Sequence, residues 1–505
     1  MPVPLPAQAP SIDLSRRVQK LTSILDVAKA FTSIRDLNSL LPMILFEAAK
    51  VVEADRCSLF LLDREHDELW SKVAQGTKEE IRFKVGIGIA GTVAKTGEVI
   101  NIPDAYADAR FNRSFDKSSG YRTKTILAVP MRNSAGEVTG VIQALNKTTV
   151  PNFTGEDVEL LIALGGQAAS AVENAMLHEE ISHLFEGFVN ASVVAIEQRD
   201  PSTAGHSGRV AALTVELAKS VERVDTGSYA GTRFNERDVD EIRYASLLHD
   251  FGKVGVREHV LVKAEKLYPH ELEMMKARFD VARKDRQVQS YKRRLTLVRE
   301  RGERALPEID REEDERLRRE LQEVEAMMGF VLECNRPTVL AQGGFEKLAA
   351  VASTVFEDGL DVRRQLLTDH EVSLLSIPRG SLSKEERLEI ESHVTHTYHF
   401  LKQIPWTRAL RRVPEIAYAH HEKLDGKGYP RNVPAPAIPV QSKMMAISDI
   451  YDAFTASDRP YKKAVPHQLA LDILKKESDS GQVDSELFKI FVEAEVPKRA
   501  LATPK

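Results

Sequence analysis

The stretch HHEKLDGKGYP, which runs from His420 to Pro430, decides how the C-terminal half of this 505-residue chain is interpreted. It does not occur alone, because three further segments are dense in imidazole and carboxylate groups. These are TAGHSGRV, LLHDFGKVG and AISDIYDAF, which contain His206, the pair His249-Asp250, and Asp449. Imidazole and carboxylate are ligands that zinc, iron and manganese take in proteins. We therefore expect one fold to gather the four segments around a metal cluster.

The segment around His249 has the residue types of a site that binds metal and phosphate. Within one turn it offers a neutral nitrogen ligand, the carboxylate of Asp250, which can bridge two cations, and the ammonium of Lys253, which attracts phosphate. Adjacent His420 and His421 cannot share one face of a helix, so we expect one ring on a metal and the other on a second metal or the substrate. A lone histidine is usually structural or solvated; His66, His178, His259 and His467 have no such companions.

Composition indicates a globular protein of two or three domains. Hydrophobic residues make up 42% of the chain and charged residues 29%, and the net charge of −5 gives no general attraction to nucleic acid. Only two cysteines occur, which fits a reducing compartment. The Pro-rich start lacks the features of a signal peptide, and no run of about 18 apolar residues is evident. We expect a cytoplasmic protein that binds neither membrane nor nucleic acid.

The hydrophobic pattern divides the chain into successive parts. Residues 1–14 are expected to be disordered, and residues 15–153 combine helical spacing with strand-like runs such as CSLFLLD and TILAVPM, which predicts an α+β unit. Residues 155–198 keep a helical period for longer than an ordinary globular helix, so we expect a connecting helix that pairs with a second copy. From 199 to 495 the pattern is almost entirely helical, and 496–505 are expected to form a tail.

Residues 276–325 are dense in charges of both signs. Sparse apolar residues and alternating charge predict a solvated helical hairpin that turns near Pro307. Such a hairpin is a candidate surface for protein partners. A nucleic-acid arm is the alternative, and the interleaved acidic residues argue against it.

Residues 197–495 resemble an HD-GYP phosphodiesterase domain through EQRDPSTAGHSGRV, LLHDFGKVG, HHEKLDGKGYP and SDIYDAFTASDRPYKKA. That family is an all-helical subset of the HD metal phosphohydrolases and hydrolyses cyclic di-GMP to pGpG or GMP. The resemblance implies a set of metal ligands: His206, His249, Asp250, His393, His420, His421 and Asp449. It also implies that Asp250 and Lys253 take part in catalysis, and it suggests iron or manganese as the metal.

The chemistry of the residues agrees with this resemblance. Hydrolysis of an anionic phosphodiester needs neutralised charge and a nucleophile at neutral pH, and two cations roughly 3.5 to 4 Å apart supply both. Arg459 and Lys462 are expected to hold the second phosphate of a cyclic dinucleotide, although a surface ion pair is the simpler interpretation. Gly428 and Tyr429 fit a tight loop over the substrate, or a purely structural turn.

Two departures from the family pattern matter. Ser202 occupies the position of a Glu that gives some members a third metal, so two metals are expected. The element that ends in a ligand His occurs twice, as KLYPHELEMMKAR with Arg278 at the ligand position and as SLSKEERLEIESHV with His393 there. Ligand chemistry selects His393 and makes roughly residues 264–380 an insertion. His396 and His399 follow at helical spacing. The sequence therefore identifies the helix that supplies the ligand more firmly than it identifies which histidine of that helix binds metal.

Residues 15–175 resemble a GAF domain, through GIGIAGTVAKTGEVINIPDAYADARF and ALNKTTVPNFTGEDVELL, and are similar to GAF domains that bind cyclic nucleotides. Their signature is matched by Asn146, Lys147, Phe153 and Asp157, whereas Val158 replaces its Glu. Lys147 and Asp157 are expected to form an ion pair. The positions that align with the ligand pocket are Ser58, Asn112, Thr123 and Gln143. A scaffold without a ligand is the alternative.

Together these patterns predict an α+β GAF domain, a long connecting helix, and an all-α HD-GYP domain with a charged helical insertion. The expected function is hydrolysis of cyclic di-GMP by a homodimer joined through the GAF domain and connecting helix, regulated by cAMP or cGMP. A phosphodiesterase for a mixed cyclic GMP-AMP is one alternative. A non-catalytic adaptor that responds to a dinucleotide is another.

Overall fold

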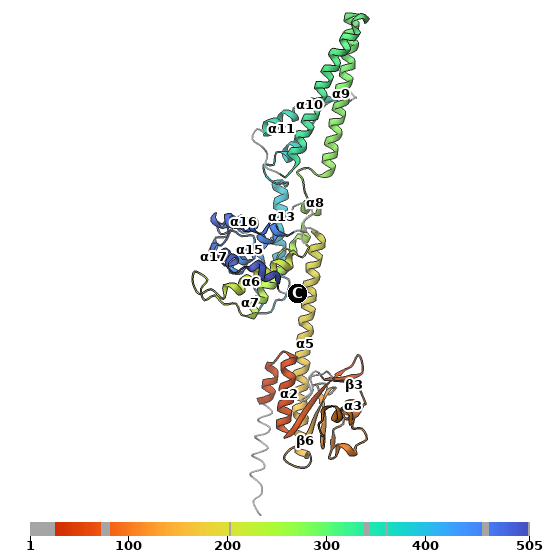
Figure 1. Cartoon of the computed structure of the whole chain (residues 1–505), viewed down its shortest axis with the longest axis vertical. Helices are drawn as coiled ribbons and strands as arrows, with labels where there is room; N and C mark the ends of the chain where they lie inside the picture. The colour runs from red at the N-terminus through yellow and green to blue at the C-terminus, as the bar shows by residue number, and fades with distance from the viewer. Residues whose placement is uncertain are drawn as a thin grey trace, which may run out of the picture. The chain divides into compact units, whose positions relative to one another are not determined.

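The structure is a computed structural model that describes residues 26–71, 81–200, 204–337, 344–358, 362–456 and 464–502. The chain divides into two compact units, residues 1–187 and residues 188–505 (Figure 1). The residues expected to be disordered, 1–14, lie outside the described part.

The first unit is built on a six-stranded antiparallel sheet with strand order β3-β2-β1-β6-β5-β4. Its strands are β1 (Ala54–Asp63), β2 (Glu68–Ser71), β3 (Ile81–Lys84), β4 (Ile100–Ile102), β5 (Ile126–Arg132) and β6 (Val138–Lys147). Strands β1, β2, β5 and β6 correspond to runs predicted from the sequence. The short edge strands β3 and β4 were not predicted, because three or four residues carry too little alternation to show a period.

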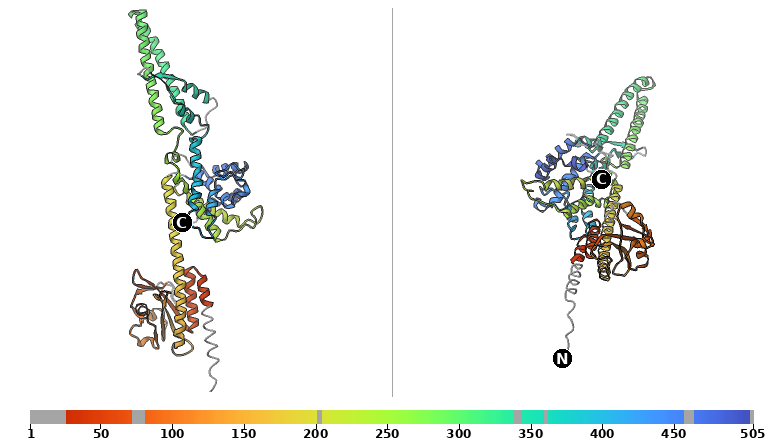
Figure 2. Two further views of the ribbon diagram at one scale, coloured as in Figure 1. Left: turned by 180° about the vertical axis from the view of Figure 1, so that it is seen from behind. Right: turned by 60° about the horizontal axis from the view of Figure 1, so that its bottom comes forward.

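Helices cover both faces of this sheet. Helix α2 (Leu37–Val51) and the first part of α5 (Gly155–Arg199) lie side by side over one face (Figure 2), where Leu41 and Leu164 join the same apolar core as Leu59 of β1. Helix α3 (Gly88–Thr96) packs on the other face, where Val93 meets Phe60 and Ile126. The short helices η1 (Ala105–Ala107) and α4 (Ser114–Ser119) follow β4.

Helix α5 is a single helix of 45 residues, as the long apolar period predicts. One 18-residue window reaches a mean hydropathy of 1.3, enough by length and composition to cross a membrane, although half of that window is buried within the structure. The sequence pattern did not predict such a window. In its second half, four large apolar side chains are exposed at coiled-coil spacing, namely Leu177, Ile181, Leu184 and Phe188.

The second unit is a helical domain with a core of its own. Leu213, Ile242, Ile447 and Phe491 come from four different helices and belong to one apolar cluster. The helices are α6 (His206–Val221), α7 (Glu236–Leu248), η3 (Phe251–Gly255), α8 (Glu258–Leu261), α13 (Lys384–Leu401), α14 (Val413–Tyr418), η5 (Ala435–Ala437), α15 (Val440–Thr455), α16 (His467–Asp479), α17 (Ser485–Glu493) and α18 (Val496–Ala502).

The expected tail is only partly a tail. Residues 496–502 form α18, and Val496 is fully buried in the core of the helical domain. Burial of one apolar side chain contributes about 1.5 to 3 kcal/mol, which is enough to fix a short terminal helix against α6. The last three residues lie outside the described part.

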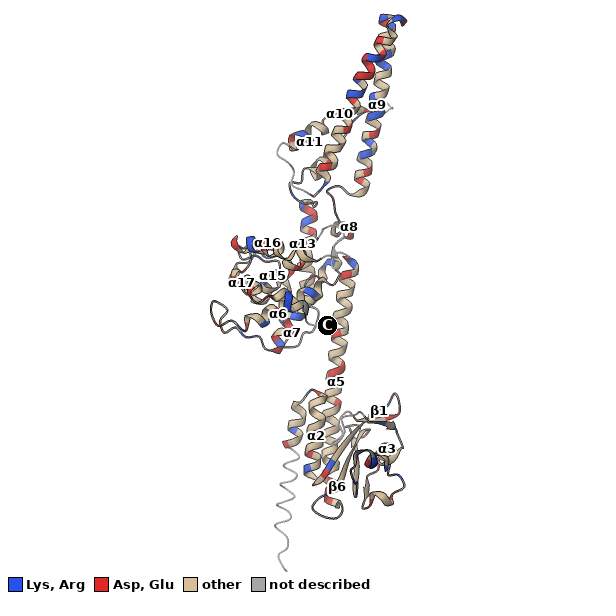
Figure 3. Cartoon of the chain, viewed as in Figure 1, with Lys and Arg blue, Asp and Glu red and all other residues tan. Residues whose placement is uncertain are grey.

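The insertion folds around a separate apolar core that includes Phe279, Val331, Phe356 and Leu375. Its elements are α9 (Pro269–Arg301), η4 (Glu303–Ala305), α10 (Leu306–Asn335), α11 (Gly344–Ala352), β7 (Val355–Glu357), β8 (Arg363–Gln365) and α12 (Asp369–Leu375). Helices α9 and α10 form the predicted charged hairpin (Figure 3), which reverses at Gly302 just before Pro307. The antiparallel pair β7-β8 is a difference from the expected all-helical insertion.

The two ends of the insertion meet beside the helical domain. The Ser381 hydroxyl donates to the carbonyl of Lys263 at 3.0 Å, and the Lys263 ammonium lies 2.8 Å from the Glu386 carboxylate of α13. The chain can therefore leave and re-enter the domain at one point.

We expect the insertion to be removable. Replacing residues 265–379 by a short Gly-Ser linker should leave the metal content per chain unchanged and preserve a cooperative thermal transition. Both quantities can be measured by elemental analysis and circular dichroism. Loss of bound metal from a variant that keeps its helical spectrum would show that the insertion helps to build the site.

Candidate metal centre

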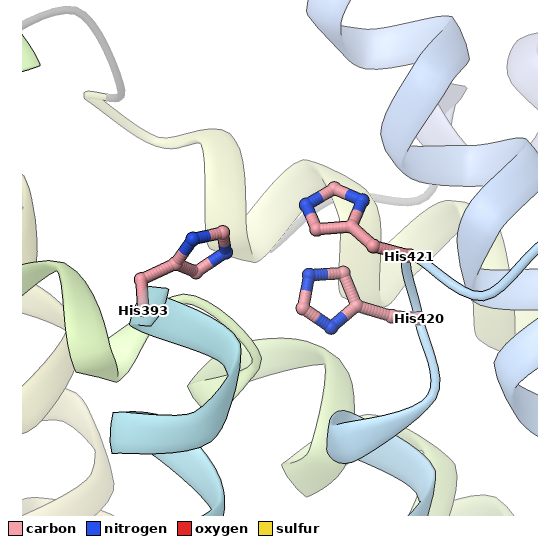
Figure 4. A group of neighbouring side chains, drawn as sticks. All are labelled: His393, His420 and His421. Atoms are coloured by element: carbon pink, nitrogen blue, oxygen red, sulfur yellow. The ribbon is translucent and has the colours of Figure 1, made fainter. Parts of the chain in front are cut away.

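Five of the seven predicted ligand positions lie on or next to helix ends of the helical domain. His206 begins α6, His249 and Asp250 follow α7, and His420 and His421 follow α14. His393 lies inside α13 and Asp449 inside α15. The imidazole rings of His393, His420 and His421 point toward one another from two separate elements (Figure 4). Sequence segments almost 250 residues apart thus meet at one place.

The Asp250 carboxylate lies between two groups of imidazoles. Its Oδ2 is 3.8 Å from Nε2 of His206 and 3.5 Å from Nε2 of His249. Its Oδ1 is 3.2 Å from Nε2 of His393. Ligand atoms of His206, His249 and Asp250 all lie within 4.8 Å of one another, and so do those of His393, His420 and His421. Each oxygen of Asp250 therefore faces a different potential cation position.

Asp449 makes the same connection from the other side. Its Oδ1 lies 3.2 Å from Nε2 of His206, and its Oδ2 lies 3.9 Å from Nδ1 of His421. A third compact group of potential ligands consists of His249, His420 and Asp449. Two carboxylates and five imidazoles are thus concentrated in one buried region.

Three of the imidazoles have a common orientation. Nδ1 of His249, His393 and His420 lies within hydrogen-bond distance of the backbone carbonyl three residues earlier, at 2.8, 2.5 and 2.6 Å. Such a bond places the ring proton on Nδ1 and leaves the lone pair on Nε2. Each of these Nε2 atoms is buried and makes no well-aligned hydrogen bond. Unsatisfied buried acceptors are costly, and a bound cation satisfies them. The residues therefore fit a metal centre.

Electrostatics keep these groups in the protonation states that bind metal. Burial lowers the pKa of His421 to about 3, despite the opposing charge of Asp449. Burial and the neighbouring rings hold the pKa of His420 well below its usual range. Burial alone would raise the pKa of Asp250, but Lys253 and His249 outweigh it and hold that pKa well below the ordinary value. At neutral pH the rings of His420 and His421 are therefore neutral and Asp250 is ionised, which are the states that bind metal.

His206 is oriented by a residue that sequence reasoning missed. Its Nδ1 lies 2.7 Å from Oδ2 of Asp452, which also accepts a hydrogen bond from Arg209 at 2.7 Å on Oδ1. Without a metal, burial disfavours the charged ring, yet Asp449 and Asp452 overcome it and raise the pKa of His206 to about 9. The spacing Asp449-x-x-Asp452 puts both carboxylates on one face of α15, a signal that could have identified Asp452.

Lys253 is held between two carboxylates. Its Nζ lies 2.8 Å from Oδ2 of Asp250 and 3.3 Å from Oδ2 of Asp200, which follows the last residue of α5. Burial would lower the pKa of Lys253, but Asp250 and Asp200 outweigh it and raise that pKa. The ammonium is therefore a fixed positive charge beside the cluster. Asp200 was not identified from the sequence.

The loop after His421 is built by close backbone contacts. A Cβ at Gly428 would lie 2.2 Å from the Lys423 nitrogen, so only glycine fits there. The buried carboxylate of Glu422 accepts from the backbone of Arg431 and Val433, at 2.8 and 3.2 Å. The Tyr429 ring centre lies 4.7 Å from that of His421. Gly428 thus has a structural role, whereas Tyr429 borders the cluster.

The geometry shows which copy of the repeated element supplies the ligand. His393 lies in the cluster, whereas Arg278 pairs with Glu371 inside the insertion. A Cβ at Gly255 would lie 2.6 Å from the His396 ring, so His396 packs on η3. Arg459, Lys462 and Ser202 lie outside the described residues.

In the first unit, the predicted signature residues fix the end of the sheet. Nζ of Lys147 lies 2.9 Å from Oδ1 of Asp157, both side chains are buried, and the expected ion pair is therefore confirmed. Asp157 also accepts from the Thr154 backbone at 2.7 Å. Asn146, in a left-handed conformation, donates to the Tyr121 hydroxyl at 2.8 Å and accepts from the Lys124 backbone at 2.6 Å. Phe153 is buried in the core.

The four predicted ligand positions of this unit differ in their surroundings. Ser58 and Gln143 are direct cross-strand neighbours on β1 and β6. The Thr123 hydroxyl is buried and donates to Asp116 at 2.7 Å. Asn112 is exposed and accepts from the backbone of Ser114 at 3.0 Å. Thr123 therefore already has a partner, and Asn112 acts in a turn.

Comparison with known proteins assigns both units. Residues 36–172 match the GAF domain family, and residues 203–328 and 370–487 match HD domain families. The chain contains a GAF domain and an HD domain. The solved GAF domain/HD domain protein from Geobacter sulfurreducens is 16% identical, with a TM-score of 0.25 over 30% of this chain and 98% of that one.

Curated relatives include phosphodiesterases. The dual 3',5'-cyclic-AMP and -GMP phosphodiesterase 11A of Takifugu rubripes is 40% identical over 166 residues, which are 30% of this chain and 18% of that protein. The probable 3',5'-cyclic phosphodiesterase pde-5 of Caenorhabditis elegans is 32% identical over 229 residues, 42% of this chain and 30% of that protein. The chain therefore spans less than a third of each of these relatives.

We expect Asp250→Asn to lower the metal content most strongly among single carboxylate changes, because the amide keeps the volume but removes the charge that faces both imidazole groups. Metal per folded chain can be counted by elemental analysis after gel filtration, with the exposed Asp479→Asn variant as the matched control. An unchanged metal count in Asp250→Asn would contradict the assignment of a shared carboxylate.

We also expect Asp157→Ala to destabilise the GAF domain by about 3 kcal/mol, because it leaves the buried Lys147 ammonium with one carboxylate fewer. Denaturant unfolding can be followed by Trp70 fluorescence in a Trp406→Phe background. The control Glu137→Ala breaks an exposed pair with Arg64 and should cost less than about 1 kcal/mol. Equal losses of unfolding free energy in the two variants would show that the buried pair stabilises the domain no more than the exposed pair does.

Proposed function

We propose that the HD domain is a metal-dependent phosphodiesterase that hydrolyses cyclic di-GMP, to pGpG, GMP or both, and that the GAF domain regulates it. The observation that supports hydrolysis most directly is Asp250, whose two oxygens face two groups of imidazoles. Among these rings, the Nε2 atoms of His249, His393 and His420 make no well-aligned hydrogen bond. That arrangement matches the needs of two adjacent divalent cations, for which we propose iron or manganese. When bound, the cations neutralise phosphate charge and provide an activated nucleophile.

The chain's own residues divide the remaining work. The imidazoles of His206, His249, His393, His420 and His421 would hold the cations together with Asp250 and Asp449. Lys253 presents a fixed positive charge where negative charge develops on the phosphate, and it needs no reorganisation because Asp200 and Asp250 hold it. Asp452 positions His206 by holding its Nδ1.

The choice of a cyclic dinucleotide depends on the sequence resemblance and on the loop next to the cluster. Tyr429 lies beside His421 and offers a ring on which a base or ribose can pack. Arg459 and Lys462 are proposed to hold the second phosphate. A mixed cyclic GMP-AMP would satisfy the same groups, so the substrate test includes it.

We also propose that a cyclic nucleotide regulates the enzyme through the GAF domain and that the enzyme is a homodimer. The named relatives act on cyclic AMP and cyclic GMP or on 3',5'-cyclic nucleotides, which supports one of these as the GAF ligand, with Ser58 and Gln143 as the best-placed pair of polar side chains. The exposed seam of α5, Leu177, Ile181, Leu184 and Phe188, supports a homodimer. We propose a cytoplasmic enzyme.

Lys253→Met provides the sharpest test of turnover. Purified without chelator, it should keep its metals yet hydrolyse cyclic di-GMP at least about 100-fold more slowly, because a positive charge at the phosphate is lost. The control Lys475→Met changes an exposed lysine on α16 and should behave as wild type. Adding cAMP or cGMP to wild type should change the rate if the GAF proposal holds.

The same assay separates the competing functions. Turnover of mixed cyclic GMP-AMP in preference to cyclic di-GMP would overturn the substrate. A fully metallated wild type that binds dinucleotides without hydrolysing any would identify a non-catalytic adaptor.

A further inference from the structure

The outward side of α9 carries an apolar stripe with a seven-residue repeat. Met274, Val281, Val288 and Leu295 are 62%, 39%, 47% and 62% exposed, and Tyr291 between the last two is 63% exposed. The side chains that α9 buries within the insertion, such as Met275, Phe279 and Ala282, lie on another face of the helix. A soluble helix normally presents polar residues to solvent. An exposed apolar repeat of seven residues is typical of a helix that pairs with another helix.

We propose that this stripe is an interface through which α9 pairs antiparallel with α9 of a second copy of the chain. In heptad notation Met274, Val281, Val288 and Leu295 take position a, and Ala277, Lys284, Tyr291 and Val298 take position d. Antiparallel helices place each a residue opposite a d residue. A single register brings together Met274 with Val298, Val281 with Tyr291, Val288 with Lys284, and Leu295 with Ala277 of the second copy.

This register is self-complementary in size. Leu295 meets the small Ala277, and Tyr291 meets the smaller Val281, so large and small side chains alternate along the seam. The two-fold axis passes near Arg286, midway between Val281 and Tyr291, and every contact occurs twice. Lys284 is the one polar member of the seam, and one polar core position is a common means of fixing the register.

The charges that flank the stripe favour an antiparallel over a parallel second copy of α9. Along the flank at position g, the N-terminal half of α9 has Glu273 and Asp280, and the C-terminal half has Arg294 and Arg301. Antiparallel pairing sets Glu273 against Arg301 of the second copy. Arg294 already pairs with Asp310 and Asp314 of α10, and Asp280 with Arg283, so the ends of the stripe carry the charge argument. Parallel pairing would instead set Glu273 against Arg278, whose guanidinium is already held by Glu371 inside the insertion.

The local pairs of Glu273 and Arg301 are exposed and leave these two charges available. Glu273 pairs with Lys276 in the same exposed turn, at 2.8 Å. Arg301 lies 3.2 Å from Glu312, and both side chains are about half exposed. Such exposed pairs are worth about 0 to 1 kcal/mol, so rearranging them costs little. The proposed interface forms between α9 of two copies of this chain. It is independent of the proposed catalytic function.

Disulfide trapping tests the orientation and the register together. The variants Val281→Cys and Tyr291→Cys, each with one added cysteine, should form a disulfide-linked dimer when mixed, because these two positions face each other in the proposed register. Neither variant should link to itself, since like positions lie ten residues apart, about 15 Å along the helix, beyond the reach of a disulfide. The native Cys57 and Cys334 are buried, so wild type serves as the blank.

Controls make each outcome decisive. A mixture of Glu315→Cys and Gln322→Cys, two exposed positions on α10, should remain unlinked under the same conditions. Peptide mapping of the expected dimer should recover the 281–291 disulfide. Linkage of Val281→Cys to itself as readily as in the mixture would overturn the antiparallel register. Absence of linkage in the mixture would overturn pairing of α9 with a second copy.

Discussion

The buried carboxylate of Asp250 is the group on which the helical domain depends. Five imidazoles and two carboxylates in one buried region would normally destabilise a protein, and three of their ring nitrogens make no hydrogen bond there. Backbone carbonyls satisfy one nitrogen of three rings, and the second nitrogen is left facing Asp250 or its neighbours. A cation bound at this site would supply the partners that these ring nitrogens lack.

Much of the architecture could be predicted because its signals are long or chemically specific. The 45-residue period of α5 and the central strands of the sheet are strong patterns, and adjacent His and Asp residues identify ligands by type. The preference for His393 over Arg278 followed from ligand chemistry alone, although the two helices have similar sequences.

Other features were inaccessible because they arise from contacts distant in the sequence. Asp200 and Asp452 look like ordinary surface carboxylates until the fold brings them to Lys253 and His206. The strands β7 and β8 are three residues each and form only because the insertion has its own core. Thr123 seemed suited to a ligand, but its hydroxyl is already bonded to Asp116.

The junction between Lys263 and Ser381 has a consequence for how this protein can change over generations. Since both ends of the insertion leave the domain at one point, α9 and α10 can gain or lose whole turns together without displacing α13 or the residues before it. Mutation can therefore vary the length of the α9-α10 hairpin while selection preserves the metal ligands. Homologous chains whose hairpins differ in length should keep the same seven ligands.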